Sequence, residues 1–299
     1  MVDEGACLGI CYADNQLFYS VNKPHNSGTL QYIGCIDFNF DVRNAIVNGD
    51  GDSFSGIKAS LEKLKLSFNC STVRVLSPAT KECWSILPRS VYEDPKERQA
   101  HIDILMHGTE HSDLESTWYS LHNDDYKLLL VRNTRTMQGF RNLLGAYPNS
   151  EYVAEFEVGS AWQNHTEING SFLTINCHNN YISVSSHILG KLRGSTVIKY
   201  DDRTDLPYLW ALYSNNLSWM RGIHEQIYIY GQYAGEISEV LTPYLDDAGE
   251  VTVMNNLEKM SVEANESTYG FRLESAFPAI LMSLNSDADK ELTDADHNG

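Results

Sequence analysis

The sequence has few basic residues for its length and no long apolar run. Its 299 residues include 22 Lys and Arg against 40 Asp and Glu, which gives a formal charge of −18 at pH 7. A chain this acidic, with its basic residues scattered, repels nucleic acids and anionic lipid headgroups. No stretch approaches the roughly 18 consecutive apolar residues of a membrane span. We therefore expect a protein that binds no nucleic acid and does not insert into a membrane.

The sequence also lacks a secretory signal and any regular spacing of its cysteines. The acidic N-terminus MVDEGACLGICYADN contains an apolar run that is too short for a signal peptide. None of the six cysteines belongs to a CxxC pair. Most of them lie in apolar strand patterns, where buried thiols behave as small hydrophobic residues. We therefore expect a cytoplasmic protein with reduced thiols.

Complete metal-binding patterns are absent as well. HGTEH (107–111) places two histidines four residues apart, as zinc sites often do, but a glycine separates them and no HExxH order follows. NGDGDSFSG (48–56) resembles the start of a calcium loop, yet it lacks the glycine of the sharp turn and the final bidentate glutamate. The sequence therefore predicts no metal site. Solvent-exposed polar segments explain both stretches.

What the sequence does contain is a repeated hairpin pattern. LGICYADNQLFYSV, residues 8–21, alternates apolar and polar positions around a polar corner, which is typical of a β-hairpin. LTINCHNNYISVSS, residues 173–186, has nearly the same pattern, and Leu8 matches Leu173 at a spacing of 165 residues. This similarity suggests that the chain contains two copies of one unit.

The segments that follow the hairpins support the duplication. LQYIGCID (30–37) falls on STVIKYDD (195–202) at the same spacing, so that Ile33 matches Ile198. Each half therefore opens with three strands, and an amphipathic helix and two further strands come next. These three later elements are 54–68, 72–77 and 83–88 in the first half, and 206–220, 226–231 and 250–255 in the second.

The region between the repeats predicts additional elements. We expect a polar helix near 93–107, strands at STWYSLH and KLLLVR, a helix over about 135–144 and a strand at YVAEFEV (152–158). The last 15 residues, NSDADKELTDADHNG, are acidic and have no apolar periodicity, which predicts a disordered tail.

This order of elements resembles the duplicated ribonuclease H-like unit of the actin-like ATPase superfamily. It is similar to the PilM/GspL branch of type IV pilus and type II secretion platforms, and to a family of uncharacterised bacterial proteins with that fold. The resemblance implies a mixed α/β protein with two actin-type lobes, each with a mixed sheet that opens with a three-strand antiparallel meander. We expect the first lobe over 1–164, the second over 165–284 and the tail over 285–299.

The resemblance also implies where a nucleotide site would lie. In ATP-using members, the first hairpin of each half carries an acid that organises Mg²⁺ and a glycine that lets backbone N–H groups approach the phosphates. Cys11 and Asn176 occupy the positions of the two acids, and neither hairpin has the glycine. Asp14 could fill the role only if the strand slipped by one residue, which would turn its side chain to the other face. In the late loop that packs on adenosine, Gly231 remains but its neighbour is Gln232.

We therefore expect a non-catalytic scaffold or adaptor with a degenerate nucleotide site, no catalytic residues and no cofactor. By analogy with PilM, its partner would be a protein or peptide, such as the cytoplasmic segment of an inner-membrane protein. The alternative is an ATPase or a sugar-kinase-like phosphotransferase that binds ATP and Mg²⁺ between the lobes. A scaffold unconnected to secretion also remains open.

The aromatic segment LPYLWALYSNNLSWM (206–220) offers candidate partner-binding residues. Its apolar stripe is explained by packing on a sheet, but Tyr208 and Trp219 fall outside that stripe by helical spacing. Aromatic residues often anchor interfaces. We predict that at least one of the two is exposed beside the groove between the lobes.

Overall fold

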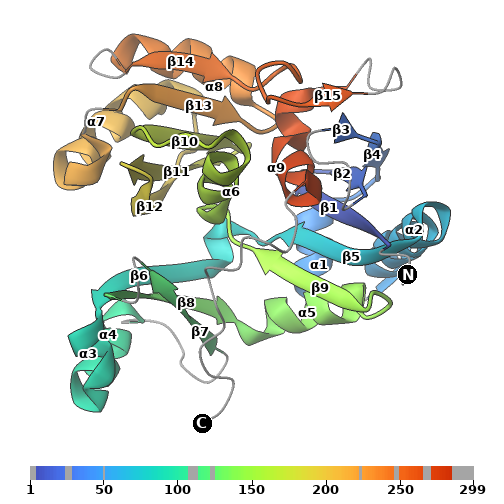
Figure 1. Cartoon of the computed structure of the whole chain (residues 1–299), viewed down its shortest axis with the longest axis horizontal. Helices are drawn as coiled ribbons and strands as arrows, with labels where there is room; N and C mark the ends of the chain where they lie inside the picture. The colour runs from blue at the N-terminus through green and yellow to red at the C-terminus, as the bar shows by residue number, and fades with distance from the viewer. Residues whose placement is uncertain are drawn as a thin grey trace.

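The computed structural model describes residues 5–23, 29–49, 51–106, 114–121, 125–221, 224–245, 249–264 and 271–284. Two five-stranded mixed sheets form its frame (Figure 1). The first has the order β4-β2-β1-β5-β9, and the second has the order β12-β11-β10-β13-β14. The strands of the first sheet are β1 (Ala6–Ala13), β2 (Gln16–Asn22), β4 (Tyr32–Asp37), β5 (Cys70–Leu76) and β9 (Asn149–Val153). Those of the second are β10 (Phe172–Cys177), β11 (Tyr181–Ile188), β12 (Lys191–Lys199), β13 (Gln226–Tyr230) and β14 (Glu250–Val253).

The two sheets have the same strand pairing, which confirms the predicted fold class. β1 pairs antiparallel with β2 and parallel with β5, and β10 pairs in the same way with β11 and β13. β4 and β12 complete the two antiparallel meanders, while β9 and β14 add a parallel strand at the opposite edges. Each predicted meander is therefore present.

The hairpin registers agree with the 165-residue spacing. Tyr12 pairs with Leu17 in the first hairpin, and Cys177 pairs with Ile182 in the second. The third strands do not keep this spacing, because Leu17 faces Ile36 whereas Ile182 faces Ile198. The predicted match of Ile33 with Ile198 is therefore wrong by three residues. The connection to the third strand is longer by that amount in the first half than in the second.

The strand predicted at 83–88 exists but belongs to a different sheet. β6 (Glu82–Pro88), β8 (Tyr126–Asn133) and β7 (Leu114–Leu121) form a separate antiparallel sheet in the order β6-β8-β7. The short helices α3 (Arg89–Glu93) and α4 (Pro95–Leu105) pack beside it, where one polar helix was predicted. The counterpart of β14 is therefore β9, which follows β5 in the sheet but not in the chain.

Three helices cover the outer face of the first sheet and two cover that of the second. On the first sheet, Leu8 and Ile10 pack against α1 (Val42–Asn48), α2 (Gly51–Phe68) and α5 (Thr134–Leu144). On the second, Leu173 and Ile175 pack against α7 (Leu206–Asn216) and α8 (Ala234–Leu241). The helices predicted at 54–68, 135–144 and 206–220 correspond to α2, α5 and α7, whereas α1 was not predicted.

Two further helices lie between the sheets. α6 (Glu157–Thr166) begins where the sequence predicted the end of a strand over 152–158, so that prediction is wrong beyond Val153. α9 (Leu273–Leu284) comes last in the described chain but packs on β1, β2 and β5 of the first sheet. Figure 1 shows it in the centre of the molecule, and its side chains share one core with residues of both sheets. The short strands β3 (Thr29–Leu30) and β15 (Glu263–Ala264) pair in parallel beside it.

No helix in the described ranges is long and apolar enough to cross a lipid bilayer. The predicted tail, 285–299, lies outside the described residues.

Candidate functional site

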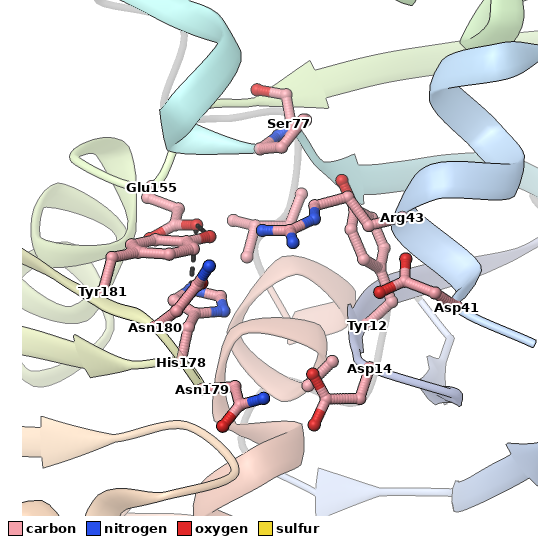
Figure 2. A pocket seen from close by; sticks show the side chains of 13 residues that line it. Tyr12, Asp14, Asp41, Arg43, Ser77, Glu155, His178, Asn179, Asn180 and Tyr181 are labelled. Carbon is pink, nitrogen blue, oxygen red and sulfur yellow. Dashed lines mark hydrogen bonds and ion pairs between the residues drawn. The ribbon is translucent and has the colours of Figure 1, made fainter. Parts of the chain in front are cut away.

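A cavity of about 100 Å³ lies between the turns of the two repeated hairpins. Figure 2 shows side chains from both halves of the chain pointing into it. It is bordered by residues that follow the carboxyl ends of β1, β5, β9 and β10, which is where open α/β sheets usually place their ligands. Its lining consists of Tyr12, Ala13, Asp14, Asp41, Arg43, Leu76, Ser77, Pro78, Glu155, His178, Asn179, Asn180 and Tyr181.

Glu155 is the most enclosed charged residue of this cavity, with 3% of its surface exposed. One of its oxygens, Oε1, lies 3.1 Å from Nε2 of His178 and accepts a hydrogen bond from the Tyr181 hydroxyl at 3.3 Å. The other accepts a hydrogen bond from the Asn176 amide at 3.0 Å. Burial alone would raise the pKa of Glu155, but His178, Asn176 and the Ala79 backbone outweigh burial and lower it. Glu155 therefore carries a negative charge that fixes the connector between β9 and α6 to the second hairpin.

The first turn of α1 brings Arg43 to the cavity. The Asp41 side chain caps this helix by accepting a hydrogen bond from the Asn44 backbone N–H at 2.7 Å. The Arg43 guanidinium lies 5.9 Å from the centre of the Tyr181 ring, and Figure 2 shows it in the middle of the cavity. Arg43 is thus aimed at the second half of the chain although it belongs to the first.

A loop of the second half is hydrogen-bonded to the turn of the first hairpin. Asp14, in this turn, has a positive φ of 49° and accepts a hydrogen bond from the Tyr233 hydroxyl at 2.6 Å. Burial and the Asp14 carboxylate raise the pKa of Tyr233 to about 12, so its hydroxyl keeps its proton and donates it to this bond. The Gln232 amide also reaches Gln16 at 3.4 Å. These two bonds join the two halves at the first hairpin turn, whose residue Asp14 lines the cavity.

Cys11 and Asn176, which the sequence resemblance predicts at the positions of the acids of ATP-using members, are both buried. The Cys11 thiol donates a hydrogen bond to the Ser275 backbone oxygen at 3.2 Å in α9, and burial raises its pKa to about 12. The Asn176 amide is bonded to Glu155. Neither side chain is among those that line the cavity. Cys11 therefore links β1 to α9, and Asn176 links β10 to the connector between β9 and α6.

Gly231 and Gln232, the predicted remnant of the adenosine loop, lie at the end of β13. Gly231 has a φ of 102°, and its backbone N–H donates to the Glu274 carbonyl of α9 at 2.8 Å. A side chain at this position would meet the Cys177 carbonyl oxygen at 2.5 Å. Glycine is therefore required here by its φ and by the close approach of β10. The role of these two residues in binding adenosine stays a prediction.

Tyr208 and Trp219 differ in exposure. Tyr208, in the first turn of α7, exposes 70% of its surface, whereas Trp219 is partly buried and its indole lies against Gly194 of β12. Neither residue lines the cavity, and Figure 1 places α7 on the outer side of the second sheet, away from α9. Partner binding by these aromatics stays a prediction, and Tyr208 is the more accessible of the two.

The histidines that the sequence places in solvated polar segments are described only in part. His101 Nε2 lies 2.9 Å from the Ser85 hydroxyl, while the histidines at 107, 111 and 122 lie outside the described residues. Within the described ranges, no group of three His, Cys, Asp or Glu side chains is arranged to hold a metal ion.

Sequence reasoning missed Arg43, Tyr12 and Glu155 as residues of this site. The stretch FDVRNAIVN contains an Asp before a short apolar pattern, a signal that could have predicted α1 and placed Arg43 in its first turn. Nothing in AEFEV distinguishes Glu155 from a surface carboxylate on a strand. Its partners lie more than 20 residues away in the chain, on the second hairpin.

No family model matches the sequence, and no curated protein matches it. Solved structures are similar in fold. A chain of the PilM–PilN type IV pilus biogenesis complex aligns with 93% of this chain and 96% of its own length, with a TM-score of 0.65 and 11% identity.

Two further structures align less closely. A Bacteroides thetaiotaomicron protein with an actin-like ATPase fold and unknown function has a TM-score of 0.51 and 12% identity, over 87% of this chain and 95% of that protein. The ethanolamine utilization protein EutJ from Carboxydothermus hydrogenoformans has a TM-score of 0.50 and 8% identity, over 94% and 89%. Together with the duplicated sheets and their central helix, these similarities establish that this chain has the actin-like ATPase fold.

Proposed function

We propose that this protein is a non-catalytic actin-like scaffold that binds a protein segment. The proposal rests mainly on the contacts of Cys11 and Asn176, the two residues at the predicted acid positions. Cys11 and Asn176 are buried and bonded to α9 and to Glu155, where an ATPase needs carboxylates that face Mg²⁺. On this proposal, residues that stabilise the fold stand at the positions where catalysis would need acids.

The dimensions of the cavity favour the same proposal. Pockets for drug-sized ligands usually enclose about 300–1,000 Å³, whereas this cavity encloses about 100 Å³. Tyr233 and Gln232 are also bonded to Asp14 and Gln16 of the first hairpin, so the two halves are joined next to this small cavity.

The proposed partner is a basic cytoplasmic segment of an inner-membrane protein. The fold is shared with a chain of the PilM–PilN type IV pilus biogenesis complex, which is an assembly of proteins. A shared fold is only an analogy for function. The charge of −18 adds a physical reason, since it attracts a basic segment and opposes direct contact with anionic lipid.

Calorimetric titration of the full chain with ATP and Mg²⁺ is expected to give no binding heat up to millimolar nucleotide. The reason is that neither lost acid position offers a carboxylate to Mg²⁺. Micromolar binding that is abolished by Gly231→Asp and weakened by the milder Gln232→Ala would contradict the proposal. That result would support the alternative of a nucleotide-binding enzyme.

Affinity capture from detergent-solubilised membranes, followed by mass spectrometry, is expected to recover an inner-membrane protein with a basic cytoplasmic segment. Tyr208→Ala should weaken that capture, because the exposed ring is an available anchor. The substitution should shift the melting temperature by no more than about 2–4 °C, since the side chain buries little surface. The matched control is Tyr244→Ala, which removes another exposed tyrosine, 58% accessible, and should leave capture unchanged. Recovery of soluble partners alone would exclude the membrane-associated version of the proposal.

A further inference from the structure

We propose that the cavity between the two hairpin turns binds a compact carboxylate group, held by Arg43 and the Tyr12 hydroxyl. The carboxylate could come from a small free acid or from the C-terminus of a peptide, and both sources present the same chemistry. This inference is independent of the scaffold function, because it concerns a ligand of the cavity and not the partner of an outer surface.

The acidic side chains of the cavity already have partners. Asp14 accepts a hydrogen bond from Tyr233, Asp41 accepts one from the Asn44 backbone, and Glu155 is bonded to the second hairpin. Each of these carboxylates therefore has at least one hydrogen-bond partner within the protein. They act on a ligand in the cavity mainly through their negative charge.

The Tyr12 hydroxyl and the Arg43 guanidinium, by contrast, have no acceptor in the described part of the chain. The Tyr12 hydroxyl has no hydrogen-bond partner there, and the residue exposes only 8% of its surface. Among the described residues, no carboxylate lies within ion-pair distance of the Arg43 guanidinium, whose nearby group is the face of Tyr181. A buried hydroxyl without a partner is costly and rare in folded proteins. Such a donor, in the same cavity as a guanidinium that pairs with no described carboxylate, indicates that an acceptor is supplied from outside.

The chemistry of this acceptor follows from charge, shape and size. A guanidinium binds a carboxylate with two parallel N–H···O bonds, so the group should be planar and anionic. Asp14, Asp41 and Glu155 repel any anion in this cavity, but they repel a phosphate with two negative charges about twice as strongly as a carboxylate, whose single charge Arg43 can balance. About 100 Å³ leaves room for a carboxylate group and little more.

The test is a titration of the full, ¹⁵N-labelled chain with sodium acetate, at an ionic strength held constant with sodium chloride. We expect saturable NMR shifts of the Arg43 Nε–H resonance, with a dissociation constant in the millimolar range or below. A short peptide with a free C-terminus and the same peptide with an amidated C-terminus separate the two sources. Inorganic phosphate is the competing anion. The absence of saturable shifts with both acetate and the free peptide, or tighter binding of phosphate than of acetate, would overturn the proposal.

Variants test the two donors separately. Arg43→Gln should weaken acetate binding at least tenfold, and Arg43→Lys should restore only part of it, because an ammonium lacks the planar fork. Tyr12→Phe should weaken binding several-fold and raise the melting temperature of the unliganded chain, since it removes a hydroxyl that is buried without a partner. A lower melting temperature for Tyr12→Phe, or unchanged binding in both Arg43→Gln and Tyr12→Phe, would contradict the assignment.

Two control variants keep these results interpretable. Arg193→Gln removes an exposed arginine of β12 that does not line the cavity and should leave acetate binding unchanged. Tyr147→Phe removes a buried hydroxyl that donates to the Leu61 carbonyl at 2.7 Å, so it should lower the melting temperature without affecting acetate. Weaker acetate binding in either control would show that the anion binds elsewhere and would overturn the proposal.

Discussion

Replacing Glu82 with leucine is expected to lower the free energy of unfolding by about 3–5 kcal/mol, because it leaves a buried arginine without its partner. Glu82 Oε1 lies 2.7 Å from Nε of Arg132, and the two side chains are 4% and 7% exposed. Burial lowers the pKa of Arg132, but the attraction of Glu82 and Glu157 outweighs burial and the pKa is raised. The guanidinium remains charged even when the Glu82 carboxylate is removed, because an arginine side chain does not lose its proton near neutral pH. Chemical denaturation of the purified variant measures this loss.

The location of this ion pair explains why its effect should be global. Arg132 also donates to the Ser77 hydroxyl at 3.3 Å and to the Tyr152 carbonyl at 3.4 Å. Ser77 follows β5 and lines the cavity, and Tyr152 belongs to β9. The pair therefore joins the three-stranded sheet to the first five-stranded sheet directly behind the cavity.

Two further variants separate the loss of the pair from other effects of the substitution. Glu93→Ala breaks an exposed ion pair with Arg89, 56% and 53% accessible, and should cost no more than about 0.5 kcal/mol. The double variant Glu82→Leu with Arg132→Met removes both charges and should recover most of the lost stability. If the double variant is as unstable as Glu82→Leu alone, the cost does not arise from the unpaired arginine.

Gly9→Ala is expected to destabilise the protein by about 3 kcal/mol, at the upper end of the usual cost of overpacking. Gly9 lies in β1 and faces α9, and a Cβ there would collide with the Ala279 carbonyl oxygen and lie 2.9 Å from the Ser283 nitrogen. Both atoms belong to the helix backbone, which cannot rotate aside as a side chain can. The helix would have to move as a whole, and its thiol contacts with Cys7 and Cys11 would be disturbed.

The matched control for Gly9 is a glycine with free space around it. Gly56 lies inside α2, and apart from its own chain neighbours and the nearby backbone of that helix no atom lies within 4 Å of the position that its Cβ would occupy. Gly56→Ala should therefore raise stability by about 0.5–1 kcal/mol, because alanine favours the helix. Thermal unfolding of the two variants beside the unsubstituted chain tests the comparison. Equal stability of Gly9→Ala and the unsubstituted chain would mean that α9 can move away from the sheet without loss.

The sequence by itself determined the local elements and the duplication. Alternation of apolar residues on both sides of Asp14 and Asn15 predicted the first hairpin, and the same pattern near Asn180 predicted the second. Their registers agree with the spacing of 165 residues. Such predictions succeed because a strand or helix with one buried face has apolar residues at a regular spacing, and that spacing can be read from residues close together in the chain.

The tertiary structure alone decided which elements are neighbours and what the candidate site contains. The pattern of 83–88 predicts a strand equally well in any sheet, and only packing places β9 beside β5. α9 is far from β1 in the chain, and the space that Gly9 leaves for it is visible only when the two are folded together. Tyr12, Arg43 and Glu155 come from three separate elements and meet in one cavity. They come together through contacts between residues that are distant in the sequence. Such contacts produce no regular spacing of residue types from which they could be predicted.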